Sequence, residues 1–273
     1  MQSAMCHSLG VCVFDVNNKG VVVTGAGHGI GRAIATKMAA NGARVVVNDL
    51  DADGANSVAK EIGGYSFPGD AATEAGVSAL INASRAHLGA IDIYFANAGI
   101  GLGAGLDTPS ADWNRAIEVN LMAHVRAAQL LVPTWLEDGS GRFVVTVSAA
   151  GLLTMLGGAP YSVTKHAAVA FAEWLSATYG ERGIIVQAIC QQGVKTRMLA
   201  DSGPLADLLS HDTALEPEAV AETVWQALQD DRFLILPHPE VQSYYELRSI
   251  KTDKWLAGMR KLQRRLDEYA RQS

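Results

Sequence analysis

The chain has 273 residues, 49% of them apolar and 18% charged, which excludes a disordered chain and is typical of one large globular domain. Its net charge of −6 argues against nucleic acid or an anionic membrane as the main partner. The three scattered cysteines (Cys6, Cys12 and Cys190) match neither a disulfide framework nor a metal motif, so we expect a cytoplasmic protein without a metal.

Residues 1–18 are expected to form an irregular N-terminal extension. No Lys or Arg precedes the weakly apolar run at residues 9–14, so a flexible leader or an upstream start codon is favoured over a signal peptide. The uncharged stretch at residues 143–161 contains Ser148, three glycines and Pro160. We therefore interpret it as a buried strand that runs into a loop, and we expect no stable membrane association.

From residue 19 to residue 236, short apolar runs alternate with longer helical patterns. The predicted strands are residues 21–24, 44–48, 65–67, 91–96, 143–147, 184–189 and 233–236. The predicted helices between them include residues 31–40, 54–61, 75–88, 111–136 and 162–179. Apolar strands that are each followed by a helix predict a single doubly wound parallel sheet of about seven strands, Rossmann-like, with helices on both faces.

The first strand leads into the sequence Thr24-Gly-Ala-Gly-His-Gly-Ile-Gly31. Glycines allow a tight turn and a close approach to a pyrophosphate, whose charge is stabilised at the N-terminus of the next helix. A plain strand–helix turn is the alternative, but a position after the first strand of an alternating chain favours dinucleotide binding.

Asp49 ends the second strand, 24 residues after Gly25. A carboxylate there can accept hydrogen bonds from the adenosine ribose hydroxyls and would repel a 2′-phosphate, so we expect NAD rather than NADP. A helix cap or turn residue is the alternative for Asp49. Asp70, after the third strand, is expected near the adenine amino group, although a turn aspartate fits its position nearly as well.

Tyr161 and Lys165 lie four positions apart in a predicted helix, and therefore on the same helical face. An ammonium beside a phenol favours the phenolate, so we expect Lys165 to lower the pKa of Tyr161 from about 10. Ser148, thirteen residues before Tyr161, can hold a carbonyl or hydroxyl oxygen while Tyr161 gives or takes the proton. This trio predicts the acid–base half of a ketone–alcohol interconversion.

Together with Asn97-Ala98-Gly99 and Asn120, these motifs resemble the classical branch of the short-chain dehydrogenase/reductase family over about residues 19–236. The resemblance implies that Ser148, Tyr161 and Lys165 are catalytic, and that Asn120 completes a water-linked proton relay. It also implies that the Asn97 segment stabilises the central sheet. The cofactor-binding residues expected in this frame are Gly25, Gly27, His28, Gly29, Ile30, Gly31, Asp49, Leu50, Asp70, Ala71, Asn97, Ala98, Gly99, Tyr161, Lys165, Val194 and Thr196.

After the sixth strand the chain departs from the family, which usually has Pro-Gly-x-Val-x-Thr where this chain has Gln191-Gln-Gly-Val-Lys-Thr196. Val194 and Thr196 match the positions that hold the nicotinamide carboxamide. Gln191 or Gln192 is expected to hydrogen-bond the substrate, with local backbone contacts as an equal alternative.

Substrate contacts are expected from Ser148, Tyr161 and an apolar wall that contains Leu153 and Met155, which favours a hydrophobic secondary alcohol or ketone. Arg197 is a candidate for an anionic substrate group, although a surface salt bridge is the favoured interpretation. Gly203 and Pro204 suggest a mobile lid.

Residues 237–273 form a C-terminal extension whose apolar residues recur at helical spacing from Lys251. We expect a helix that packs on the same domain or on a neighbouring subunit. The resemblance favours a homotetramer.

The leading hypothesis is therefore an NAD-dependent oxidoreductase that interconverts a secondary alcohol and a ketone. Two alternatives stay open at this point. One is a lyase or epimerase that uses bound NAD transiently, and the other is a non-catalytic NAD-sensing protein on the same fold.

Overall fold

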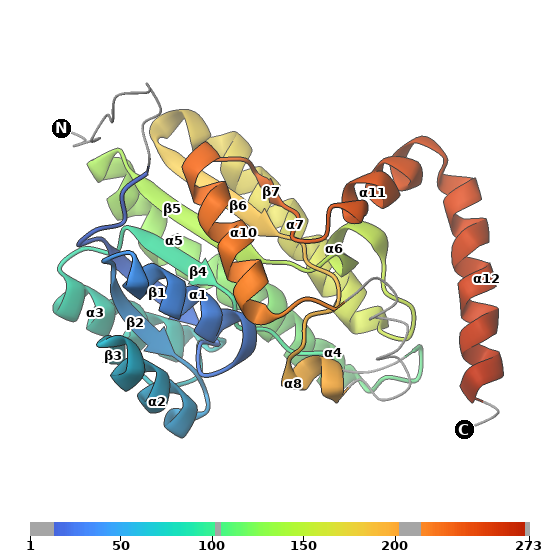
Figure 1. The fold of residues 1–273 in the computed structure, drawn as a ribbon, viewed down its shortest axis with the longest axis horizontal. Coiled ribbons are helices and arrows are strands. Elements are labelled where there is room, and N and C mark those ends of the chain that lie inside the picture. The colour runs from blue at the N-terminus through green and yellow to red at the C-terminus, as the bar shows by residue number, and fades with distance from the viewer. Residues whose placement is uncertain (1–13, 102–104, 202–213, 271–273) are drawn as a thin grey trace.

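A computed structural model describes residues 14–101, 105–201 and 214–270 of the protein. Its centre is one sheet of seven parallel strands in the order β3-β2-β1-β4-β5-β6-β7 (Figure 1). The strands are β1 (Gly20–Thr24), β2 (Arg44–Asn48), β3 (Tyr65–Ser66), β4 (Ile93–Ala96), β5 (Gly141–Thr146), β6 (Ile184–Ile189) and β7 (Leu234–Ile235). The predicted doubly wound fold is confirmed.

Helices cover both faces of this sheet. Within the described residues, the α-helices are α1 (Gly29–Ala40), α2 (Ala52–Ile62), α3 (Glu74–Leu88), α4 (Ser110–Ile117), α5 (Ala123–Asp138), α6 (Ala150–Leu153), α7 (Ala159–Tyr179), α8 (Arg197–Ala200), α10 (Pro217–Asp230), α11 (Glu240–Ile250) and α12 (Thr252–Ala270). Two shorter turns are the π-helix η1 (Glu118–Met122) and the 3₁₀-helix η2 (Gly180–Arg182).

The hydrophobic core has two layers because successive strand residues point to opposite faces. Val22 belongs to the layer that contains α3, α5 and α7, whereas Val21 and Val23 belong to the layer that contains α1, α2 and α10. All three valines are completely buried. This packing holds the carboxyl ends of all strands at one edge, where a doubly wound sheet binds its ligand.

The predicted elements are recovered with two corrections. The single helix expected over residues 111–136 is divided into α4, η1 and α5, because a π turn interrupts it at Asn120. Several strands also begin or end one or two residues away from the predicted limits; β4, for example, begins at Ile93. Element ends depend on hydrogen-bonded neighbours, which hydrophobic patterns do not reveal.

The two ends of the described chain differ. Residues 14–18 are irregular as expected, yet Val16 is completely buried and the ring of Phe14 lies 4.3 Å beneath the Arg142 guanidinium. At the other end, α11 packs on α6, and α12 turns away from the body of the molecule (Figure 1). A helix from about Lys251 was predicted and is α12, but α12 does not lie back on the domain.

Among the described helices, none is long and apolar enough to cross a membrane. No cluster of three or more metal-ligating side chains occurs within the same described residues. Gly203 and Pro204, the residues of the predicted lid, lie outside the described part of the chain.

Candidate active site

The glycine-rich turn connects β1 to α1 at the carboxyl edge of the sheet. Gly25 adopts a left-handed conformation (φ +61°), and a β-carbon on Gly31 would lie 2.2 Å from the carbonyl oxygen of Gly25. Side chains at these two positions would therefore disrupt the turn. The turn leaves backbone N–H groups at the start of α1, a 12-residue helix, and such a helix start favours a phosphate. These features fit the pyrophosphate of a dinucleotide.

Asp49 lies beside this turn. Its Oδ2 accepts a hydrogen bond from the backbone N–H of Gly27 at 2.8 Å, and its Oδ1 accepts one from Asp51 at 3.0 Å. These bonds orient the carboxylate and leave further acceptor capacity for ribose hydroxyls. Asp70 accepts a bond from the backbone N–H of Ala72 at 2.9 Å, so the predicted turn role is observed. Asp70 also lines the adjacent cleft, so its predicted adenine contact remains a prediction.

Asn97 connects three central strands. Its side-chain amide donates to the carbonyl oxygens of Thr24 (2.9 Å) and Gly25 (3.1 Å), and its Oδ1 accepts a bond from Thr146 (2.9 Å). Thr24 and Thr146 end β1 and β5, so Asn97 binds the neighbours on either side of β4. The structural role implied by the family resemblance is thus observed at atomic level.

A cleft of about 1200 Å³ runs along this edge of the sheet. Its lining includes most of the expected cofactor residues, namely Gly25, His28, Gly29, Ile30, Gly31, Asp49, Leu50, Asp70, Ala71, Asn97, Ala98, Gly99, Tyr161, Lys165 and Thr196. Gly27 and Val194 are buried beside the cleft. Gln191 lines it as well.

Tyr161 and Lys165 lie at the inner end of the cleft, on α7. Pro160 occupies the first turn of that helix, where a missing N–H costs nothing. Lys165 Nζ donates to the carbonyl oxygen of Thr146 at 2.8 Å and lies 5.6 Å from the centre of the Tyr161 ring. The predicted pairing on one helical face is therefore observed.

The electrostatic expectation for this pair was wrong. Burial raises the pKa of Tyr161, opposed by a hydrogen bond to the Ser148 hydroxyl. Burial also disfavours the charged form of Lys165, and so lowers the pKa of Lys165 to about 8. In a low-dielectric site both charged forms are disfavoured, and this desolvation is the largest influence on each of the two pKa values. Spacing along a helix does not reveal how deeply the two groups are buried.

Ser148 follows β5 with a φ of +77°, a left-handed conformation that few non-glycine residues adopt. Its Oγ accepts a hydrogen bond from the N–H of Ala150 at 3.2 Å and donates a long one of 3.4 Å to the carbonyl of Gln191. Strained backbone of this kind is concentrated at functional sites. The conformation was not predicted from sequence, because serine has no preference for it.

Asn120 is completely buried in the π turn η1. Its Oδ1 accepts from the N–H of Ile100 at 2.8 Å, and its Nδ2 donates to Ile100 O (2.9 Å) and to Thr164 Oγ1 (3.1 Å). The side chain therefore fastens the segment after Gly99 to α7. Its expected part in a proton relay remains a prediction.

The two glutamines that replace the family's Pro-Gly differ in position. Gln191 is 7% exposed, and its completely buried Oε1 has no hydrogen-bond partner among the described residues. Gln192 instead donates from its backbone to His238 (3.2 Å) and from its side chain to Glu240 (3.2 Å). Local contacts thus account for Gln192, whereas they leave the Gln191 side chain unexplained.

The two residues of the predicted apolar substrate wall do not line the cleft. Leu153 and Met155 are partly buried around α6, and the cleft lining described above does not include them. The backbone of Met155 is tied to Ser162, whose Oγ accepts from Met155 N at 2.8 Å. Their contact with substrate remains a prediction.

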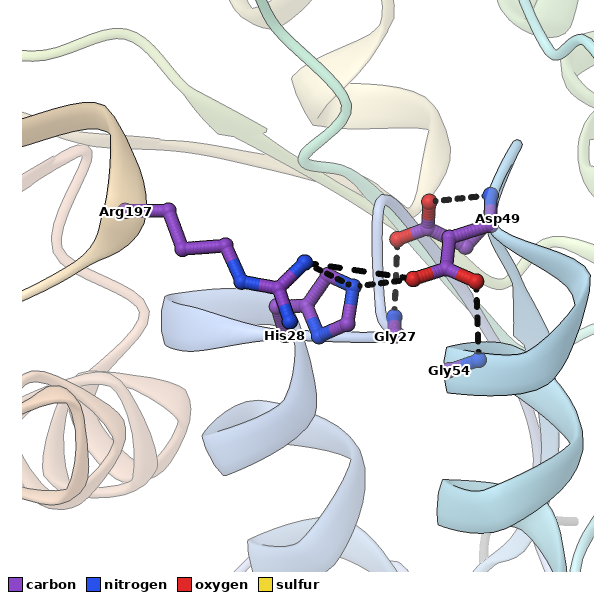
Figure 2. A network of polar contacts seen from close by, with 6 residues as sticks. Gly27, His28, Asp49, Gly54 and Arg197 are labelled. Carbon is purple, nitrogen blue, oxygen red and sulfur yellow. Dashed lines mark hydrogen bonds and ion pairs between the residues drawn. The ribbon is translucent and has the colours of Figure 1, made fainter. Parts of the chain in front are cut away.

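Two features escaped the sequence analysis. Arg197, Asp51 and His28 converge above the glycine-rich turn (Figure 2), with 3.9 Å between Arg197 and Asp51. The surface salt bridge favoured for Arg197 is therefore observed, although its partner was not foreseen. His124, one helical turn after Asn120, is 2% exposed, and burial together with the Lys165 charge lowers its pKa to about 3.

Comparison with known proteins gives a consistent result. The family model for short chain dehydrogenase matches residues 19–205. A relative, the 1-deoxy-11-beta-hydroxypentalenate dehydrogenase of Streptomyces avermitilis, is 32% identical over 232 residues, which are 81% of this chain and 85% of the relative.

Two solved structures are similar as well. One is a short-chain dehydrogenase/reductase from Burkholderia phymatum in complex with NAD (26% identity, TM-score 0.81, covering 88% of this chain and 96% of the other). The second is a 7α-hydroxysteroid dehydrogenase complexed with NADH and 7-oxo glycochenodeoxycholic acid (30% identity, TM-score 0.75, covering 81% and 92%).

Proposed function

The chain belongs to the short-chain dehydrogenase family, and on that premise we propose that it is an NAD-dependent oxidoreductase that interconverts a secondary alcohol and a ketone. One observation carries the proposal. Tyr161 and Lys165 line the same cleft as the glycine-rich turn and Asp49, and the Ser148 hydroxyl is hydrogen-bonded to Tyr161. A protein that only senses NAD needs the glycine-rich turn and Asp49, but it does not need Ser148, Tyr161 and Lys165.

NAD is favoured over NADP by the charge of Asp49. The carboxylate is fixed by the backbone N–H groups of Gly27 and Asp51, so it cannot turn away from a 2′-phosphate without losing both bonds. The NAD and NADH in the two similar structures support the same choice. When bound, NAD supplies the acceptor for the hydride.

The protein's part is to hold the substrate oxygen and move its proton. Because burial raises the pKa of Tyr161, its Oη keeps the proton at neutral pH and can donate it to a carbonyl oxygen in the reductive direction. Oxidation requires a deprotonated Tyr161 to accept the alcohol proton. The rate of alcohol oxidation should therefore rise with pH. Ser148 Oγ, next to Tyr161, orients the same oxygen.

The substrate is proposed to be a hydrophobic secondary alcohol or ketone. Polycyclic substrates are named for both the pentalenate and the hydroxysteroid relatives. Leu153 and Met155 are proposed as its apolar contacts, and Gln191 as its polar contact, because a buried amide oxygen without a partner is costly. Asn120 is proposed to complete the proton relay through Lys165.

The direct test follows absorbance at the reduced-nicotinamide band. Purified protein is given NAD or NADP and a panel of secondary alcohols graded from small polyols to bulky polycyclic ones. We expect turnover with NAD and with the bulky alcohols. A rate with NADP alone would contradict the Asp49 argument. Silence across the panel, with NAD binding shown separately by calorimetry, would favour transient redox chemistry or a sensor.

A cytoplasmic homo-oligomer, with a tetramer favoured, is part of the proposal. On α7, the side chains of Val163 and Trp174 are each 54% exposed, which supports an interface between copies of the chain. The projection of α12 away from its own body is consistent with packing on a neighbouring subunit. Light scattering of the full chain and of a variant that ends at Lys251 tests both points.

A further inference from the structure

A polar bridge crosses the mouth of the cleft above the glycine-rich turn. Arg197, the first residue of α8, places its Nη1 3.0 Å from His28 Nε2 and 3.9 Å from Asp51 Oδ2. His28 Nε2 is in turn 2.6 Å from Asp51 Oδ2. Figure 2 shows the Arg197 side chain extending from one wall toward His28 at the turn and toward the carboxylate next to Asp49.

A second contact joins the same two walls. A β-carbon built on Gly29 would lie 2.9 Å from the Thr196 methyl group, so Thr196 packs directly on the turn. Thr196 also caps α8, since its hydroxyl accepts a long bond of 3.5 Å from the N–H of Leu199. Residues 196 and 197 therefore both lie against the turn where the pyrophosphate is expected to bind.

The contacts of this bridge hold the Arg197 side chain only weakly. His28 Nε2 faces both a carboxylate and a guanidinium, but one ring nitrogen either donates or accepts at a given moment. Only one of its two contacts is thus a hydrogen bond at any time. The Arg197 and Asp51 side chains are 73% and 41% exposed, and exposed ion pairs contribute little in water.

A bound dinucleotide would bring a diphosphate dianion to the start of α1, close to the charges of Asp49 and Asp51. Two other cations that line the cleft are already paired with carboxylates. Arg32 is paired with Glu61 at 2.9 Å, and Lys195 with Glu216 at 2.5 Å. Arg197, by contrast, already reaches over the turn.

We propose that Arg197 is a cofactor-binding residue that leaves the His28–Asp51 pair and clamps the diphosphate of the dinucleotide. A guanidinium binds phosphate oxygens through two parallel hydrogen bonds, which its contact with His28 does not provide. Asp51 is the competing anion that holds Arg197 when no diphosphate is present. This inference rests on the proposed binding of NAD, and it adds a residue that nothing in the glycine-rich motif reveals.

The first test measures binding rather than turnover. Calorimetry with NADH, ADP-ribose and adenosine is carried out on the full-length protein and on Arg197→Gln. We expect Arg197→Gln to weaken the binding of NADH and of ADP-ribose by about tenfold. The binding of adenosine should stay unchanged, because adenosine lacks the diphosphate. Arg232→Gln is the matched control, since Arg232 is an exposed arginine paired with Asp230 at 3.3 Å outside the cleft lining.

The decisive variant is Asp51→Asn. Asp51 caps α2 by accepting from the N–H of Gly54 at 3.1 Å, and asparagine caps a helix as well as aspartate does. The variant therefore removes the competing charge and keeps the cap. If Arg197 is a clamp, Asp51→Asn should tighten ADP-ribose binding several-fold. If the bridge only holds the site in shape, the variant should weaken binding as Arg197→Gln does.

Either of two results overturns the inference while leaving the proposed function intact: unchanged ADP-ribose binding in Arg197→Gln, or weaker binding in Asp51→Asn. A wild-type protein that binds neither NADH nor ADP-ribose would instead overturn the proposed NAD dependence. Thermal unfolding of each variant, monitored by circular dichroism, shows whether it is folded.

Discussion

At one end of the cleft, Asp49, Asp51 and Arg197 are partly open to solvent, whereas at the other end Tyr161 is 9% and Lys165 2% exposed. The outer groups lie near water and would act through their position and the sign of their charge. The inner groups lie where ionisation itself is costly, so their proton affinities are shifted. The proposed cofactor recognition and the proposed proton transfer would thus use different physical means within one cleft.

The difference also concerns strain. The outer turn achieves its unusual backbone with glycines, for which a positive φ carries little cost. The inner end has a left-handed serine and a buried amine, both of which oppose folding. We therefore expect substitutions at the inner end to separate activity from stability, and substitutions at the outer end to alter cofactor preference.

The largest expected effect comes from Tyr161→Phe. Removing Oη eliminates the proton donor but keeps the ring that packs beside Lys165, so kcat should fall by about a thousandfold or more while NADH affinity is kept. Steady-state kinetics and calorimetry measure the two quantities. Tyr179→Phe, at the far end of α7, is the control. Unchanged turnover in Tyr161→Phe would remove the basis for the mechanism.

Lys165→Met tests the cost of the buried amine. The pKa of Lys165 is about 8 in the folded state against 10.5 for a lysine amine in water, so between these values the unfolded chain binds more protons. Wild-type stability should therefore rise from pH 8 to pH 10.5. The Met variant lacks this dependence. Its stability advantage should be largest below pH 8, up to about 3 kcal/mol, and should shrink as the pH rises.

Thermal melts of both proteins at pH 7 and pH 10 check this, and the difference between their Tm values is the quantity of interest. A difference in Tm that stays constant with pH would mean that burial does not shift the pKa of Lys165. Turnover of the Met variant should be lost at both pH values.

Ser148→Gly and Ser148→Ala separate strain from chemistry. Both variants lose the hydroxyl and should lose most activity, but only glycine relieves the left-handed conformation. We expect Ser148→Gly to be more stable than Ser148→Ala by about 1 kcal/mol, measured by urea unfolding. Thr154→Gly is the control, because Thr154 also has a positive φ of +72° but is not one of the proposed catalytic residues, so this variant should gain stability with normal activity. Equal stability of the two Ser148 variants would argue against strain.

Asp49→Asn addresses the outer end. Loss of the charge should raise the ratio of kcat/KM for NADP to kcat/KM for NAD by about tenfold. NAD binding should weaken only modestly, because the amide keeps one acceptor oxygen. Kinetics with each cofactor give the ratio, and Asp53→Asn in the first turn of α2 serves as the control. If the ratio does not change, the preference for NAD must come from another group.

Much of this molecule followed from sequence. Seven apolar runs and the helices between them predicted the sheet, because strands buried on both faces must be apolar throughout. The glycine-rich turn and Asp49 identified one part of the cleft, because they lie within a few residues of a strand end, and the spacing of Tyr161 and Lys165 on one helix identified another. Local chemistry of this kind is visible in the order of residues.

Tertiary structure decided the rest, because it depends on groups far apart in the chain. The pKa shifts of Tyr161 and Lys165 arise from burial by several elements, and the left-handed Ser148 is held by its neighbours in the fold. The bridge joins residues 169 positions apart, from His28 to Arg197, which no motif connects. Sequence therefore determined which groups are present and at which strand ends they lie, whereas only the packed structure determined their ionisation, their strain and their partners across the cleft.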